Sequence, residues 1–165
     1  MELKSLDDLE LLNPNFHPKF IVIHHSLTKD QKTVDSKAIR KYHMEVNGWV
    51  DVGYHFLTEF TGEHYSIVSG RSMLKTGAHV KDFNTQSLGV CMVGNFDLNE
   101  VPHDQWQLTL RLVRKLQWFL HIPTEMVIGH REAQALLGMP LEKRKTCPGL
   151  KCDMVSFRLD LASMI

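Results

Sequence analysis

The chain has 165 residues, a length typical of one domain, and 43% of them are hydrophobic, which is ordinary for a globular protein. Lys and Arg number 19, as do Asp and Glu, so the formal net charge is zero and the composition gives no sign of a nucleic acid partner. No apolar run approaches the length of a membrane span, and three cysteines are too few for a disulfide framework.

The beginning of the chain, MELKSLDDLELL, is acidic and has too little apolar length for a secretory signal. We therefore expect the protein to be cytoplasmic as synthesised. Residues 1–18 are predicted to be an N-terminal extension, with a short helix over residues 5–12. Residues 19–165 are predicted to form the single folded domain.

The first half of this domain predicts a strand, a helix and a hairpin. Residues 19–25 (KFIVIHH) form a short apolar run that is typical of a buried strand. Thr33 is the expected N-cap of a helix that continues to about Val46. Two strands are then predicted, over residues 54–60 and 63–68.

The middle of the chain predicts a long ordered loop, a central strand and the longest helix. The loop covers residues 70–85, and the strand covers residues 87–94 (SLGVCMVG). Pro102 can start the helix, which runs to about Leu120, because its missing N–H is not needed there. The stripe expected to face the core is Leu108, Leu112, Leu116 and Phe119.

The last third predicts a short strand over residues 125–128, a short helix over residues 131–137 and a final helix over residues 153–163. Strands separated by helices indicate a single α/β domain, with a central mixed β-sheet flanked by helices on both faces. Binding sites in such domains lie at strand ends. Polar residues stand at three predicted strand ends, namely His24-His25, Gly53-Tyr54-His55 and Gly129-His130.

Ten histidines direct attention to metal or proton chemistry. His24 and His130 stand at strand ends, and Cys147 lies in a loop just before Pro148. Two imidazoles and a thiolate make a reasonable catalytic zinc set, with a fourth position open for water or substrate. Spacing alone leaves an alternative open, in which both histidines are capping or core residues and the cysteine is a small buried residue.

Six motifs around these residues occur in one order: IVIHHS at 21–26, DVGYHF at 51–56, GAH at 77–79, Asn84 with SLGV at 87–90, GHRE at 129–132 and KTCPG at 145–149. This series resembles the N-acetylmuramoyl-L-alanine amidase family, which includes phage lysis amidases and animal peptidoglycan recognition proteins. The similarity extends from about residue 19 to residue 161 and is closest to the single-domain phage enzymes.

The resemblance implies that residues 19–165 form a zinc amidase domain with one Zn²⁺ per chain, held by His24, His130 and Cys147. It also implies that Tyr54 and Lys145 assist catalysis. A hydroxyl and an ammonium group are suitable donors to the oxyanion that forms when an amide is hydrolysed. Members of the family that only recognise peptidoglycan typically lack the cysteine, which this chain has.

Three further residues are candidates for substrate binding. By resemblance, His79 and Asn84 border the substrate groove, with an ordinary polar loop as the alternative. His43 lies near the end of the first long helix and either faces the groove or is a surface histidine.

Other histidines and cysteines are expected to be structural. His25 and His55 alternate away from the candidate site residues that precede them along their strands. Cys91, in the central strand, is expected in the core. Cys152 is expected to be a free thiol, with a competing ligand as the alternative.

The resemblance implies hydrolysis of the amide bond between N-acetylmuramic acid and L-alanine in peptidoglycan, by a phage or prophage endolysin that acts on the cell wall after release. Two alternatives stay open: a cytosolic amidase that trims anhydro-muropeptides in cell-wall recycling, and a non-catalytic module that binds peptidoglycan or regulates a partner. Some phage amidases of this type inhibit an RNA polymerase, which makes a polymerase a candidate partner. We expect a monomer whose substrate is peptidoglycan or a muropeptide.

Overall fold

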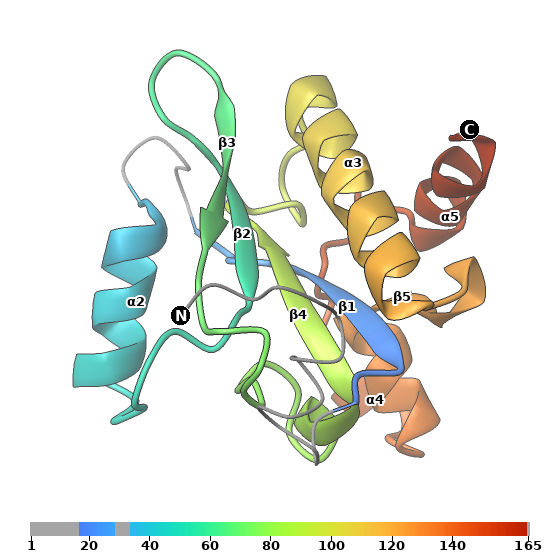
Figure 1. Cartoon of the computed structure of the whole chain (residues 1–165). Helices are drawn as coiled ribbons and strands as arrows, with labels where there is room; N and C mark the ends of the chain where they lie inside the picture. The colour runs from blue at the N-terminus through green and yellow to red at the C-terminus, as the bar shows by residue number, and fades with distance from the viewer. Residues whose placement is uncertain (1–16, 29–33, 165) are drawn as a thin grey trace.

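Five strands form one mixed sheet in the computed structural model, which describes residues 17–28 and 34–164 (Figure 1). The strands are β1 (Phe20–His25), β2 (Phe56–Phe60), β3 (Tyr65–Ser69), β4 (Ser87–Met92) and β5 (Val127–Gly129). Their order in the sheet is β3-β2-β4-β1-β5. Strand β1 pairs in parallel with β4 and β5, β2 pairs in parallel with β4, and β2 and β3 form an antiparallel hairpin.

Helices cover both faces of this sheet. They are α2 (Ser36–Glu45), α3 (His103–Leu120), α4 (His130–Leu136) and α5 (Met154–Ser163). Figure 1 shows α2 on one side of the sheet, with α3 and α5 on the other. The predicted fold class, a single α/β domain with a mixed sheet between helices, is confirmed. None of the helices in the described part of the chain combines the length and apolar character needed to cross a bilayer.

Alternation along β1 divides its side chains between the two faces. Ile21 and Ile23 belong to the main core, which α3 and α5 cover. Val22 points to the opposite face, where it packs with Ala133 of α4. His24 therefore shares the face of Val22, at the carboxyl end of the strand, whereas His25 faces the main core.

Two predicted details lie partly or wholly outside the described residues. The N-terminal extension and its short helix fall largely on residues 1–16, and Thr33 also lies outside. The observed N-cap of α2 is Asp35, whose side chain accepts a hydrogen bond from the backbone N–H of Ala38 at 2.8 Å. The helix therefore begins at Ser36, later than the sequence predicted.

The predicted core stripe of α3 was wrong at two positions. Leu108 and Phe119 are only partly buried, whereas Gln105 and Thr109 are fully buried. The reason is that these two polar side chains find partners in the sheet. Gln105 Nε2 donates to the carbonyl oxygen of Thr58 at 2.9 Å, and the Thr109 hydroxyl lies 3.1 Å from the Thr58 hydroxyl. These hydrogen bonds offset part of the cost of burying the two side chains, although Oε1 of Gln105 has no partner among the described residues.

We predict that Phe157→Ala lowers the free energy of unfolding by about 3–5 kcal/mol, because a fully buried ring leaves a cavity. Phe157 of α5 is fully buried, and its ring centroid lies 4.9 Å from that of Trp106 in α3. Urea denaturation measures the change. Leu159→Ala on the same helix is the control, since Leu159 is 66% exposed. Equal effects of the two substitutions would contradict this description of the core.

Candidate metal centre

Three buried side chains from distant parts of the chain meet beside the carboxyl end of β1. The Nδ1 atom of His24 lies 3.2 Å from Nδ1 of His130 and 3.5 Å from Sγ of Cys147. The candidate ligand atoms of these residues all lie within 4.8 Å of one another. Two nitrogen ligands of a tetrahedral zinc ion lie about 3.4 Å apart. The cluster therefore has the spacing of a site that could hold a metal ion.

The backbone brings these residues together through strand pairing and one glycine. Ile23 of β1 lies in register with Gly129 of β5, so the residues that follow them are neighbours. A Cβ atom added to Gly129 would lie 2.7 Å from Cδ of Pro148. Glycine at this position therefore lets the loop that carries Cys147 pack directly against the end of β5.

A third histidine, His79, lies behind His24 and determines which nitrogen of the His24 ring carries the proton. The Nε2 atom of His24 lies 3.0 Å from Nδ1 of His79, and Nε2 of His79 lies 3.4 Å from the carbonyl oxygen of Ser87. Because a carbonyl oxygen only accepts, His79 carries its proton on Nε2 and accepts at Nδ1. His24 then donates from Nε2, which leaves the lone pair of its Nδ1 free toward the cluster.

Burial keeps both imidazoles of the cluster neutral. It lowers the pKa of His24 well below the ordinary value, and neighbouring His79 and His130 lower it further. Burial, followed by the charge of Lys145, lowers the pKa of His130 to about 4. Neutral imidazoles are the form that binds a metal ion.

Burial favours the uncharged form of the cysteine as well, but for a thiol this means a raised pKa. Burial raises the pKa of the Cys147 thiol to about 12, although the positive charges of Lys145 and Arg131 act in the other direction. In the metal-free protein the thiol therefore keeps its proton. A bound cation is the kind of charge that deprotonates such a thiol.

The two predicted catalytic residues lie close to the cluster. The ring of Tyr54 is 5.1 Å from that of His24, centroid to centroid. Burial, and then the Cys91 and Cys147 thiols, raise the pKa of Tyr54 well above its usual value, so its hydroxyl remains a hydrogen-bond donor. Lys145 is exposed, and its charge lowers the pKa of His24 and of His130.

Comparison with known proteins identifies the family. The family described as N-acetylmuramoyl-L-alanine amidase matches residues 14–150. The chain belongs to this amidase family. The endolysin of Enterobacteria phage T3 is 38% identical over 109 residues, which are 62% of this chain and 70% of the endolysin. The endolysin of Escherichia phage T7 is 38% identical over 102 residues, which are 58% of this chain and 65% of the endolysin.

Solved amidase structures share the fold. The N-acetylmuramoyl-L-alanine amidase LysC from Clostridium intestinale URNW is similar with a TM-score of 0.74 at 25% identity, over 90% of this chain and 87% of that chain. Drosophila PGRP-LB is similar with a TM-score of 0.67 at 24% identity, over 91% of this chain and 84% of that chain, which is a likeness of fold alone. The amidase family inferred from the six motifs is thus confirmed.

The three residues predicted to bind the amidase substrate lie in different places relative to the cluster. His43 lies beside Tyr54, with 5.6 Å between ring centroids, and its Nδ1 accepts from the backbone N–H of Gly53 at 3.1 Å. His79 is buried behind His24. The Asn84 amide oxygen accepts from the backbone N–H of His79 at 2.8 Å, so Asn84 fixes the turn that carries this histidine. Substrate contact by these three residues stays a prediction.

The side chains of both histidines expected to be structural hydrogen-bond to residues outside the cluster, while the His25 backbone forms a hydrogen bond with Cys147. The backbone N–H of Phe96 donates to Nδ1 of His25 at 3.2 Å. His55 accepts from the backbone N–H of Gly89 at 2.9 Å through Nδ1, while its Nε2 lies 2.9 Å from the Lys75 carbonyl oxygen.

The two remaining cysteines are buried free thiols. Cys91 lies in the core, as predicted, and is paired in register with His24 on the neighbouring strand. It also interacts with Tyr54, which packs against the same core cluster. Cys152 also lies in the core. The metal-type cluster found among the described residues does not include it.

The contact between His79 and His24 was missed from the sequence, although a signal for it exists. Gly89 stands in the middle of the central strand, and a Cβ atom there would lie 2.7 Å from the His79 ring. Glycine inside a strand often marks the close approach of another group. Gly89 of the motif SLGV is therefore a sequence signal for the His79 ring that packs against it and supports His24.

We predict that the metal-free protein loses stability as the pH falls from about 6.5 toward 4. Burial lowers the pKa of His55 and His130 to about 4 and that of His79 to about 3. The unfolded chain, with ordinary histidines, binds protons first. Each histidine therefore lowers the free energy of unfolding by up to about 1.4 kcal/mol per pH unit.

Urea denaturation with a chelator present, repeated across this pH range, measures the slope. His55→Gln should flatten the slope, whereas His64→Gln, at an exposed position, should leave it unchanged. A free energy of unfolding that is constant across the range would contradict the burial of neutral histidines.

Proposed function

We propose that this chain is a zinc-dependent amidase that hydrolyses the bond between N-acetylmuramic acid and L-alanine in peptidoglycan. The observation that carries the proposal is the buried cluster of His24, His130 and Cys147 in a member of this amidase family. Nitrogen and sulfur ligands suit zinc better than magnesium or calcium, which prefer oxygen. The free lone pair of His24 Nδ1, supported by His79, agrees with a ligand role.

The residues around the cluster supply what amide hydrolysis requires. His24, His130 and Cys147 would hold the zinc ion, which when bound polarises a carbonyl group and activates water. Tyr54 keeps its proton, so its hydroxyl can donate to the oxyanion of the tetrahedral intermediate or pass a proton to the leaving amine. The Lys145 ammonium group can stabilise the same negative charge.

Similarity to the endolysins of phages T3 and T7 supports a role in phage or prophage lysis, in which the enzyme acts on the cell wall after release. Retention of the cysteine favours an enzyme over a module that only binds peptidoglycan. A monomeric state and a regulatory contact with an RNA polymerase stay predictions.

The direct test compares two substrates for the purified, zinc-analysed protein. We expect one zinc ion per chain and release of L-alanine amino termini from intact sacculi. Turnover of soluble anhydro-muropeptides alone would replace the lysis role with a recycling role. If zinc-loaded protein binds sacculi without releasing amino termini, the result would contradict the enzyme proposal and favour a non-catalytic binding module.

Tyr54→Phe and Lys145→Ala should each lower kcat by about 10²–10³, because these donors act on charge that develops in the transition state. Zinc content should not change. Tyr42→Phe and Lys143→Ala are matched controls, since both positions are exposed, and they should keep normal kcat. Near-normal kcat in the Tyr54 and Lys145 variants would remove the proposed oxyanion roles.

A further inference from the structure

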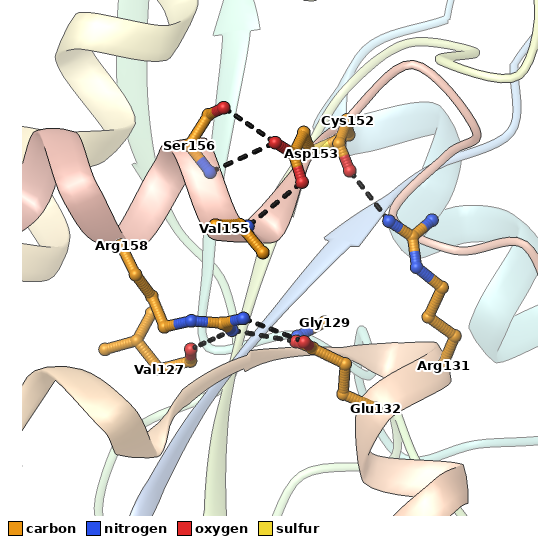
Figure 2. A network of polar contacts seen from close by, with 9 residues as sticks. All are labelled: Val127, Gly129, Arg131, Glu132, Cys152, Asp153, Val155, Ser156 and Arg158. Carbon is orange, nitrogen blue, oxygen red and sulfur yellow. Dashed lines mark hydrogen bonds and ion pairs between the residues drawn. The ribbon is translucent and has the colours of Figure 1, made fainter.

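Arg131 directly follows the candidate ligand His130 and contacts the loop that carries Cys147. Its backbone N–H donates to the carbonyl oxygen of Cys147 at 2.9 Å. Its guanidinium Nη1 donates to the carbonyl oxygens of Thr146 at 2.9 Å and of Gly149 at 2.7 Å. Figure 2 shows the third side-chain contact, in which Nη2 donates to the Cys152 carbonyl oxygen at 2.9 Å.

These four hydrogen bonds hold a segment that has no regular structure of its own. Residues 144–153 form neither helix nor strand, so no ladder of backbone hydrogen bonds fixes them. The three carbonyl groups that the Arg131 side chain binds stand on both sides of Cys147. One planar guanidinium group therefore contacts the chain both before and after the candidate ligand, which constrains its path there.

The surroundings of Arg131 agree with this role. Among the described residues, no carboxylate forms an ion pair with its guanidinium group within 4.0 Å. The other arginine in Figure 2, Arg158, instead pairs with Glu132 at 3.0 Å and donates to the Val127 carbonyl oxygen. The side chain of Arg131 thus binds the loop, whereas that of Arg158 joins α4, β5 and α5.

A second residue holds the opposite side of the same loop. The Asp97 carboxylate accepts from the Thr146 hydroxyl at 2.8 Å and from the backbone N–H of Leu150 at 2.9 Å. Asp97 lies after β4, whereas Arg131 is adjacent in sequence to a candidate ligand. Gln134 of α4 also holds this loop, by accepting from the backbone N–H of Lys145 at 2.8 Å. Arg131 differs from both in contacting carbonyl groups on either side of Cys147 and the Cys147 carbonyl itself, directly after His130 in the chain.

We propose that Arg131 is a positioning residue for the metal centre, which holds Cys147 at ligand distance from His130 before metal binds. This inference rests on the metal site of the proposed function. Without the guanidinium group, metal binding would have to order the loop, and that ordering would weaken affinity. Lysine has a single ammonium group in place of the planar fork, so it cannot reproduce the three side-chain contacts.

The test measures binding of zinc and cobalt(II) to the full chain by competition with a chromophoric chelator. The near-ultraviolet thiolate-to-cobalt charge-transfer band reports ligation by Cys147. We expect Arg131→Ala to lower zinc affinity by about 10–100-fold, and Arg131→Lys to recover only part of the loss. Arg158→Ala is the matched control: it should lower Tm but keep zinc affinity within about twofold and the cobalt band unchanged.

Zinc affinity and a cobalt band in Arg131→Ala equal to those of the wild type would overturn the inference, even with a lower Tm. If Arg131→Ala does not fold, Arg131→Lys decides, and wild-type affinity in that variant would equally overturn it. Wild-type protein that binds neither metal would instead contradict the proposed zinc site itself.

Discussion

Parallel pairing of β1 with β5 is the constraint on which the candidate metal centre depends. It places the carboxyl ends of two strands side by side, so His24 and His130 meet although 106 positions separate them in the chain. Alternation along β1 then decides which histidine faces the cluster, because His24 and His25 point to opposite faces of the sheet. Cys147 joins them from a loop that packs against Gly129 at the same strand end.

Burial gives this centre its electrostatic character. Imidazoles and a thiol that are removed from water prefer their uncharged forms, which explains the lowered histidine pKa values and the raised cysteine pKa. The cost of burying these polar groups is offset by hydrogen bonds, including the chain from His24 through His79 to Ser87. Burial therefore keeps the imidazole lone pairs of His24 and His130 available to a metal ion, because protonation of these buried rings is unfavourable.

The sequence predicted those parts of the fold whose cause is local. The apolar run before His24 predicted β1 to within one residue, and Asp153 caps α5 by accepting from the backbone N–H of Val155 and Ser156. The core face of α3 was predicted less well, since Gln105 and Thr109 are buried by partners in β2. Those partners lie about 50 positions away and leave no periodic signal in the helix.

The same distinction holds for the candidate site. Ordered motifs were enough to select His24, His130 and Cys147, and the structure brings these three residues together. Gly89 left a signal for the support from His79 that the motifs alone did not reveal. Support from Arg131 left no such signal, because it depends on which carbonyl groups face its guanidinium group. Such contacts join residues from separate elements and follow from the packed chain, not from spacing along it.

The central claim is that the His24, His130 and Cys147 cluster holds zinc, and anomalous diffraction from crystals of the zinc-loaded protein tests it most directly. Data on either side of the zinc absorption edge locate the metal without assuming its ligands. We predict one strong anomalous peak within coordination distance of Nδ1 of His24, Nδ1 of His130 and Sγ of Cys147, about 2.0–2.3 Å from each. A fully loaded crystal with its peak at His25, at Cys152 or on the surface would contradict the account.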